Sequence, residues 1–248
     1  GPGIDMYSMR QPLGVVASIM PFNFPAMMPL WHVGPALACG NAVVLKPSER
    51  DPSVPLMLAE LFVEAGLPKG VFQVVNGTKE AVDTLLDHEI IQGVSFVGST
   101  PIAQYIYSRA TANGKRAQCF GGAKNHLIVM PDADIAQAAA GTAAGIFFNS
   151  GQVCCAGSRL YVHKKIFDNL VADVSAIAEG MTLGQGLDPS VDLGPLISQK
   201  QLDRVCGYID DGQSQGARVA TGGGRAGDSG FFVKPTVLVD VDQSARVV

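Results

Sequence analysis

Strand-like runs alternate with helix-like runs through the first half of the chain, and this alternation most limits the folds that the chain can adopt. Short apolar runs at residues 14–20 and 41–45 are typical of buried strands. Between them, residues 27–39 are long enough for a crossover helix that ends at Gly40. The pattern then predicts strands at 71–75, 90–97 and 127–130, and helices at 54–65, 79–86 and 101–111. Such alternation predicts an α/β fold built on a doubly wound parallel sheet.

The composition of the sequence changes after Asp134, where an Ala-rich segment predicts a helix at residues 135–148. A Gly-containing turn and a strand at 159–162 follow, and the tail holds expected helices at 165–180 and 200–212 before a Gly-rich loop and the apolar run 231–239. We therefore expect two domains, residues 1–121 and 122–248.

Composition and charge exclude several classes of protein. Of 248 residues, 47% are hydrophobic, and 18 Lys and Arg stand against 22 Asp and Glu for a net charge of −4, which argues against a disordered chain and against nucleic acid as a partner. The apolar runs are far short of the roughly 20 residues that a membrane span needs. Five cysteines at irregular spacings suit neither a disulfide framework nor a metal site. We expect a soluble protein of a reducing compartment, the bacterial cytoplasm or the mitochondrial matrix of a eukaryote, without a bound metal.

The segment FFNSGQVCCAGSR, residues 147–159, is the most informative one. Its adjacent Cys154 and Cys155 follow a helix end and a Gly-containing turn. A thiol in such a turn can be reached by a substrate, and nearby backbone N–H groups can lower its pKa and stabilise an oxyanion. The alternative is that both cysteines are small buried fillers, as most free cysteines are.

Three further segments place polar groups directly after expected strands. In PFNFP the amide of Asn23 could donate a hydrogen bond, although Asn between prolines is also an ordinary turn residue. In LKPSER, Lys46 and Glu49 follow a strand at the edge where α/β sheets bind ligands, or form a surface ion pair of little energetic value. In FVGST, Gly98 and Ser99 precede a helix that could face a phosphate, a weak signal by itself.

Together, these four segments in this order resemble the aldehyde dehydrogenase superfamily, from about Tyr7 to the end of the chain. The similarity is greatest to its CoA-acylating methylmalonate/malonate semialdehyde branch, marked by PFNFP, LKPSER, SFVGS and GKRAQCFGGAKNHLIVMPDAD. The resemblance implies a Rossmann-type NAD-binding domain over residues 1–121, incomplete at its N-terminus. It also implies part of the α/β catalytic domain over 122–248, incomplete at its C-terminus.

The resemblance also assigns roles to particular residues. Cys154 matches the nucleophile that attacks the aldehyde and later carries a thioester, because the family's cysteine stands two residues after a Gln, here Gln152. Cys155 is the second choice. Asn23 matches the residue that forms the oxyanion hole with the Cys154 backbone N–H.

The expected cofactor is NAD, and its contacts follow from the same resemblance. Lys46 and Glu49 match the pair that holds the adenosine ribose, and a carboxylate there would repel the 2′-phosphate of NADP. The remaining expected contacts line the cofactor channel, flank that pair or meet the pyrophosphate: Met20, Phe22, Ser48, Arg50, Gly98, Ser99 and Gly121.

The chain departs from the hydrolytic members of the family at the general base. Their Glu falls on Cys119 or Phe120 here, depending on the alignment, and no Glu occurs between Glu89 and Glu179. Without a carboxylate, activation of water to hydrolyse a thioester should be slow, whereas the thiol of CoA needs less help. We therefore expect CoA as the acyl acceptor.

Two further departures concern substrate and length. The semialdehyde branch usually has an Arg just before its nucleophile to bind the substrate carboxylate, and Val153 stands there, so a less acidic aldehyde is an alternative substrate. Family members are roughly twice as long and are expected to form homo-oligomers. The alternatives to a CoA-acylating enzyme are an inactive fragment that at most binds nucleotide, a hydrolytic aldehyde dehydrogenase, and a thiol esterase without redox chemistry.

Overall fold

A computed structural model describes residues 1–248 of the protein. The chain divides into two compact units, Gly1–Gly122 and Ala123–Val248, which are described one at a time. No helix in either unit has the length and apolar character needed to cross a membrane.

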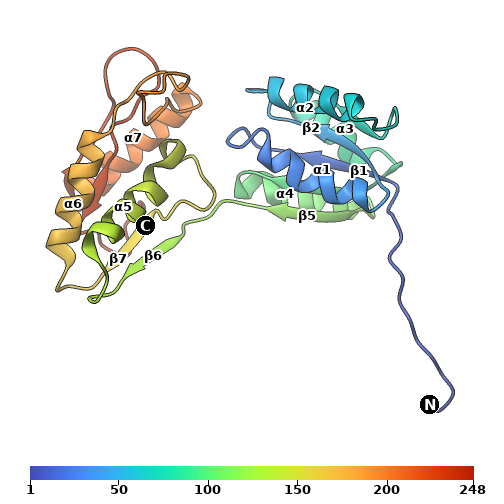
Figure 1. Cartoon of the computed structure of the whole chain (residues 1–248), viewed down its shortest axis with the longest axis horizontal. Coiled ribbons are helices and arrows are strands. Elements are labelled where there is room, and N and C mark those ends of the chain that lie inside the picture. The colour runs from blue at the N-terminus through green and yellow to red at the C-terminus, as the bar shows by residue number, and fades with distance from the viewer. The chain divides into compact units, whose positions relative to one another are not determined.

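The first unit is built on a five-stranded parallel sheet in the order β3-β2-β1-β4-β5 (Figure 1, blue to green). The chain order therefore reverses between β1 and β4, which is the arrangement of a doubly wound sheet. Its strands are β1 (Val15–Ile19), β2 (Ala42–Lys46), β3 (Phe72–Val74), β4 (Ile91–Val97) and β5 (Arg116–Phe120). Its helices are α1 (Met27–Ala38), α2 (Ser53–Glu64), α3 (Lys79–Asp87) and α4 (Thr100–Ala112).

Apolar side chains cover both faces of this sheet. Alternate residues of β1 point to opposite faces, and Ala17 and Ile19 join a core with Leu86 of α3 and Ile106 of α4. On the other face, Leu45 of β2 packs with residues that include Met20 and Met28. Helices therefore lie on both faces, and the prediction of an α/β fold with a parallel sheet is confirmed.

The end of α1 shows how local sequence fixes one of these elements. Gly40 adopts φ +82°, a left-handed conformation that glycine reaches without strain, and its N–H donates to Leu37 O at 2.9 Å. Asn41 then returns to the helix, with its N–H donating to Ala36 O at 3.0 Å. The side-chain oxygen of Asn41 accepts from Leu13 N at 2.7 Å, which joins the helix end to the residues before β1.

One strand of the sheet, β5, was not among the strands expected from the sequence. Its residues RAQCF alternate in exposure because β5 is an edge strand that pairs only with β4, from Gly93↔Arg116 to Val97↔Phe120. A strand of this kind contains no continuous apolar run, and for that reason the residue pattern does not reveal it.

The second unit has a smaller framework of strands and three long helices (Figure 1, yellow-green to red). Two parallel strands pair from His126↔Arg159 to Val129↔Val162. Residues 218–221 and 237–239 form an antiparallel pair of strands. The sequence pattern predicted no such pair and indicated only the apolar run 231–239, of which residues 237–239 form the second strand. The elements are β6 (His126–Val129), α5 (Ile135–Phe147), the 3-10 turn η1 (Phe148–Gly151), β7 (Arg159–Val162), α6 (Phe167–Gly180), α7 (Gln199–Ser214), β8 (Arg218–Thr221) and β9 (Val237–Val239).

The core of the second unit joins α5 to α6. Ala139 and Ala143 of α5 and Leu170 and Val174 of α6 are each no more than 1% exposed. Small residues on α5 leave room for the larger side chains of α6, so the Ala-rich composition of this helix follows from its packing.

Ile106 and Ile102 lie one turn apart on α4 and provide a matched test of the first core. Ile106 is fully buried, whereas Ile102 is 48% exposed. We expect Ile106→Ala to lower the free energy of unfolding by about 2–5 kcal/mol through lost burial and a residual cavity. Ile102→Ala should cost under about 1 kcal/mol. Chemical denaturation of both variants measures the difference, and equal losses would contradict the assigned packing.

Candidate active site

The carboxyl ends of β1, β2 and β4 lie at the same level of the first unit. Ile19 pairs with Lys46 of β2 on one side and with Phe96 of β4 on the other. Ligands of doubly wound sheets bind at this edge, next to the point where the strand order reverses. The structure therefore brings the expected cofactor contacts to one edge of one sheet: Met20, Phe22, Lys46, Ser48, Glu49, Arg50, Gly98, Ser99 and Gly121.

The Lys46–Glu49 pair is more than a surface ion pair. Lys46 Nζ lies 3.2 Å from Glu49 Oε2, but the lysine side chain is only 6% exposed, against 50% for the glutamate. A buried ammonium needs a hydrogen-bonding partner, and here the partner also reaches solvent. Partial burial alone would raise the pKa of Glu49, but hydrogen bonds from its backbone and from Lys46, with the charges of Lys46 and Arg50, hold the pKa below its usual value. The pair thus presents an ionised carboxylate at the end of β2.

The loop after this pair is held by its own side chains. Ser48 is 8% exposed, and its Oγ accepts a hydrogen bond from Arg50 N at 3.2 Å. Asp51 follows, and burial raises the pKa of its carboxyl to about 6, against the effect of hydrogen bonds from Ser48 and from its own backbone. Its Oδ1 is buried and has no hydrogen-bond partner. Sequence patterns did not single out Asp51, because its environment depends on how the loop folds.

Gly98 and Ser99 join β4 to α4. The Gly98 N–H donates to Phe120 O at 3.1 Å, and a Cβ on Gly98 would lie 2.4 Å from Cζ of Phe96. Glycine is therefore needed here for packing against a buried ring. Ser99 is the N-cap residue of α4, and its side chain makes no capping hydrogen bond to the first turn. The first turn thus keeps N–H groups that could bind an anion.

Gly121 packs against the same end of α4. A Cβ at Gly121 would lie 2.9 Å from Thr100 Oγ1 and 3.2 Å from Thr100 Cα. The adjacent Gly122 N–H donates to Thr100 Oγ1 at 2.9 Å. This pair of glycines lets the chain after β5 approach the helix closely, which explains the glycines without a ligand; a cofactor contact of Gly121 stays a prediction.

The loop between β1 and α1 carries three of the expected residues. Met20 is 4% exposed, its side chain lies in the core, and its N–H donates to Lys46 O at 3.0 Å. Phe22 and Asn23 are half-buried in the turn that precedes α1. Asn23 belongs to the first unit and Cys154 to the second, so their joint oxyanion hole stays a prediction.

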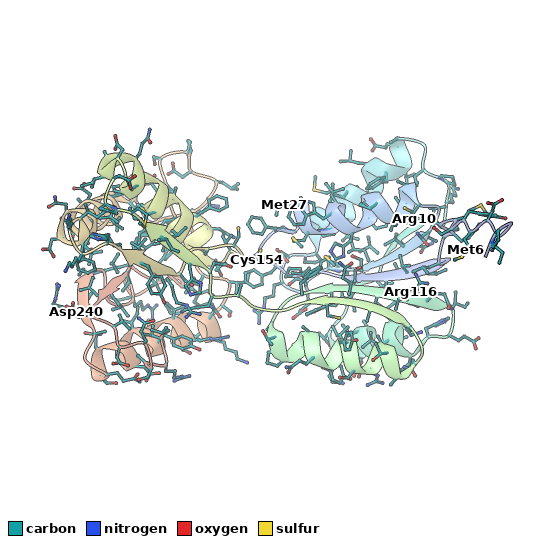
Figure 2. The ribbon with its side chains drawn as sticks, turned by 90° about the horizontal axis from the view of Figure 1, so that it is seen from below. Met6, Arg10, Met27, Arg116, Cys154 and Asp240 are labelled. Carbon is teal, nitrogen blue, oxygen red and sulfur yellow. The ribbon has the colours of Figure 1, made fainter.

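Cys154, labelled in Figure 2, lies in a loop of the second unit, and both Cys154 and Cys155 are exposed. The alternative that they are buried fillers is therefore wrong. The loop begins in an unusual conformation, because Asn149 and Ser150 adopt φ of 50° and 53°. Such backbone costs of order 1–3 kcal/mol per residue and persists only where the surroundings impose it.

Hydrogen bonds to a distant segment impose that conformation. Ser150 Oγ donates to Gly194 O at 2.6 Å, and Gln152 Oε1 accepts from Ile197 N at 3.0 Å. Gln152 Nε2 also donates to Asn149 O at 3.3 Å. Gln152, two residues before Cys154, therefore has a structural role, because its side chain fixes the start of the cysteine loop.

Asn125 holds the loop from the other side and was missed as a site residue in the sequence. Its Nδ2 donates to Cys154 O at 2.7 Å and to Ala156 O at 3.2 Å. Arg159 N in turn donates to Asn125 O at 3.0 Å. A side chain about 30 residues away thus fixes the carbonyl of the candidate nucleophile, and only the AKNH motif drew attention to this segment.

The two positions considered for a general base carry no carboxylate. Cys119 is half-buried on β5, and burial raises the pKa of its thiol. Phe120, the alternative position, is 49% exposed. A half-buried thiol of raised pKa is a poor nucleophile, so Cys119 is not a candidate for that role.

The family follows from comparison with known proteins. The aldehyde dehydrogenase family model matches residues 2–248, so the chain belongs to the aldehyde dehydrogenase family. A malonate-semialdehyde dehydrogenase of Pseudomonas aeruginosa is 49% identical over 238 residues, which cover 94% of this chain and 48% of that protein. The chain thus spans about half the length of the curated relatives it matches.

Solved structures show the same relationship. A Sinorhizobium meliloti protein described as a methylmalonate-semialdehyde dehydrogenase, in complex with NAD, is 48% identical with a TM-score of 0.94, covering 100% of this chain and 51% of that one. An E. coli enzyme described as NADP dependent is 39% identical with a TM-score of 0.93, covering 96% of this chain and 50% of that one.

The raised pKa of Asp51 predicts how the stability of the fold depends on pH. Its pKa of about 6 in the folded chain lies above the ordinary 3.8, so the ionised carboxylate costs free energy above pH 6, and the cost fades as pH falls toward 4. A pKa rise of this size corresponds to a loss of about 3 kcal/mol in the free energy of unfolding at high pH. Solvent screening in this half-exposed loop reduces the expected loss to about 1 kcal/mol.

We expect Asp51→Asn to raise the free energy of unfolding by about 1 kcal/mol at pH 8 and by much less at pH 4, measured by urea denaturation at both values. Asp188→Asn is the control, because hydrogen bonds from Ser190 lower the pKa of Asp188 and its removal should not stabilise the fold. A gain at Asp51 that is equal at both pH values would contradict the burial of its charge.

Proposed function

We propose that this chain carries the nucleotide-binding and nucleophile-bearing regions of an NAD-dependent aldehyde dehydrogenase that oxidises a small semialdehyde and transfers the acyl group to CoA. The observation that carries the proposal is the exposed Cys154 in a loop fixed by Gln152 and Asn125. The family membership and the similarity to semialdehyde dehydrogenases support it.

The first unit supplies the groups that fit NAD. The ionised, half-exposed carboxylate of Glu49 suits ribose hydroxyls, and the buried Lys46 keeps it in place. The same carboxylate disfavours a 2′-phosphate. The first turn of α4, after Gly98 and Ser99, suits a pyrophosphate. Solved relatives include one described with NAD and one described as NADP dependent, so the shared fold alone does not set the cofactor preference.

In the second unit, Cys154 performs the covalent chemistry. Its thiolate attacks the aldehyde carbon and forms a C–S bond, and the carbonyl oxygen becomes an alkoxide. The Cys154 backbone N–H and the amide of Asn23 stabilise that charge by donating hydrogen bonds. NAD held by the first unit would supply the hydride acceptor, and Cys154 would then carry the acyl group as a thioester. Asn125 keeps the loop in place by holding the Cys154 carbonyl.

The missing carboxylate decides how the thioester is released. Neither Cys119 nor Phe120 can take a proton from water, so hydrolysis lacks a base at that position. A CoA thiolate attacks the thioester carbon, the C–S bond to Cys154 breaks, and the cysteine thiolate is regenerated. A small acidic semialdehyde is the proposed substrate by similarity to the relatives, although Val153 supplies no positive charge for its carboxylate.

Reduction of NAD with malonate semialdehyde, with and without CoA, tests the proposal. We expect NADH formation that depends on CoA, and a fall of about a thousandfold or more in Cys154→Ala, because the nucleophile is lost. Cys155→Ala is the matched control and should retain most of the activity. Propionaldehyde serves as the uncharged alternative substrate.

The other outcomes favour different functions. NADH formation without CoA would indicate a hydrolytic aldehyde dehydrogenase. Hydrolysis of an activated ester with no NADH would indicate a thiol esterase. Binding of NAD without turnover by the folded chain would indicate that this region serves only to bind nucleotide. Each of these results contradicts the proposed acyl transfer to CoA.

A further inference from the structure

Three successive residues before the cysteine pair have left-handed backbone. Asn149, Ser150 and Gly151 adopt φ of 50°, 53° and 73°. The Gln152 N–H donates to Asn149 O at 3.0 Å and closes the turn. L-residues adopt this conformation singly rather than in runs, because Cβ comes too close to the following carbonyl oxygen. The turn therefore needs support from outside itself.

Ser150 is the residue of this turn that has no conformational preference for it. Glycine carries no Cβ, and asparagine tolerates left-handed backbone because its short side chain makes local hydrogen bonds. Asn149 makes such a bond, from its Nδ2 to Gln152 O at 3.4 Å. Serine has neither advantage, so the support has to act at Ser150. Strained backbone of this kind is common where a site must be held in one geometry.

The Ser150 hydroxyl provides that support. Its Oγ donates to Gly194 O at 2.6 Å, across a sequence separation of 44 residues. The segment that carries this carbonyl is itself held in place. Leu196 is 4% exposed, and its N–H donates to Phe231 O at 2.9 Å. The hydroxyl thus connects the left-handed turn to a segment that is anchored in the second unit.

Cys154 lies in a β-turn whose interior is also fixed. Ala156 N donates to Val153 O at 3.1 Å, so Cys154 and Cys155 are the two central residues of this turn. The Cys154 N–H belongs to the same peptide plane as Val153 O and points the opposite way, out of the turn. Asn125 holds the later end through the carbonyls of Cys154 and Ala156. The direction of the whole β-turn therefore depends on how its earlier end is held.

We propose that Ser150 is a positioning residue for Cys154. Its hydroxyl holds the left-handed turn and thereby directs the Cys154 thiol at a carbonyl carbon and the Cys154 N–H at the carbonyl oxygen. Ser150 needs no contact with substrate or cofactor for this role. The inference rests on the proposed function in taking Cys154 as the nucleophile, and it deepens that function by naming a residue that orients it.

Acetylation by p-nitrophenyl acetate, without NAD or CoA, tests this role. The Cys154 thiolate attacks the ester carbon, the new C–S bond carries the acetyl group, and p-nitrophenolate leaves. Peptide mass spectrometry gives the separate rates at Cys154 and Cys155, both of which are exposed. We expect faster acetylation of Cys154 in the unaltered chain. Ser150→Ala should lower the Cys154 rate about tenfold, the effect of one lost hydrogen bond, and leave the Cys155 rate unchanged.

Two further variants separate the hydroxyl from the backbone. Ser150→Gly loses the same hydrogen bond but accepts left-handed backbone without strain, so its Cys154 rate should fall less, by about threefold. Ser158→Ala is the matched control, because Ser158 is an exposed serine four residues after Cys154, as Ser150 lies four residues before it. Its ratio of the two rates should equal that of the unaltered chain.

Hydrogen exchange of the same variants distinguishes a local effect from a general loss of stability. Ser150→Ala should speed exchange in residues 149–156 and leave the core of α5 and α6 unchanged. An unchanged ratio of Cys154 to Cys155 acetylation in Ser150→Ala, or no preference for Cys154 in the unaltered chain, would overturn the proposal. A greater loss in Ser150→Gly than in Ser150→Ala would do the same. Absence of NADH formation would count against the proposed function alone, because this ratio requires no cofactor.

Discussion

The register of three parallel strands determines which residues meet at the carboxyl edge of the first sheet. Because Ile19 pairs with both Lys46 and Phe96, the chain leaves β1, β2 and β4 at one level. The residues that follow these strands therefore lie at the same edge of the sheet. A slip of one residue would turn the alternating side chains to the opposite faces and remove Ala17 and Leu45 from the cores in which they pack. Burial on both faces thus fixes the register, and the register sets the positions of the residues that we propose to bind the cofactor.

The cysteine loop depends on a different kind of constraint. It has no regular secondary structure, so its shape is set by a few hydrogen bonds to distant segments, from Ser150 to Gly194, from Ile197 to Gln152 and from Asn125 to Cys154. These bonds offset the cost of left-handed backbone at the start of the loop. An exposed thiol is therefore combined with a backbone held by hydrogen bonds, which suits the nucleophilic role proposed for Cys154.

The sequence predicts the parts of this protein that depend on local patterns. Continuous apolar runs reveal the central strands, and Gly40 marks the end of α1, because burial on both faces and left-handed backbone leave direct signals. The edge strand β5 leaves no such signal, since three of its five residues face solvent. Asn125 and Asp51 were also missed, because a hydrogen bond across 29 residues and a carboxylate buried in a loop depend on the tertiary fold.

The proposed mechanism requires that Cys154, rather than its neighbour Cys155, becomes acylated during the oxidation of an aldehyde. The most direct measurement is mass spectrometry of the chain after incubation with NAD and malonate semialdehyde in the absence of CoA, with fragmentation to locate the modified residue. We expect an acyl adduct on Cys154 that disappears when CoA is added. An adduct on Cys155, or an adduct on Cys154 that forms without NAD and persists with CoA, would contradict it.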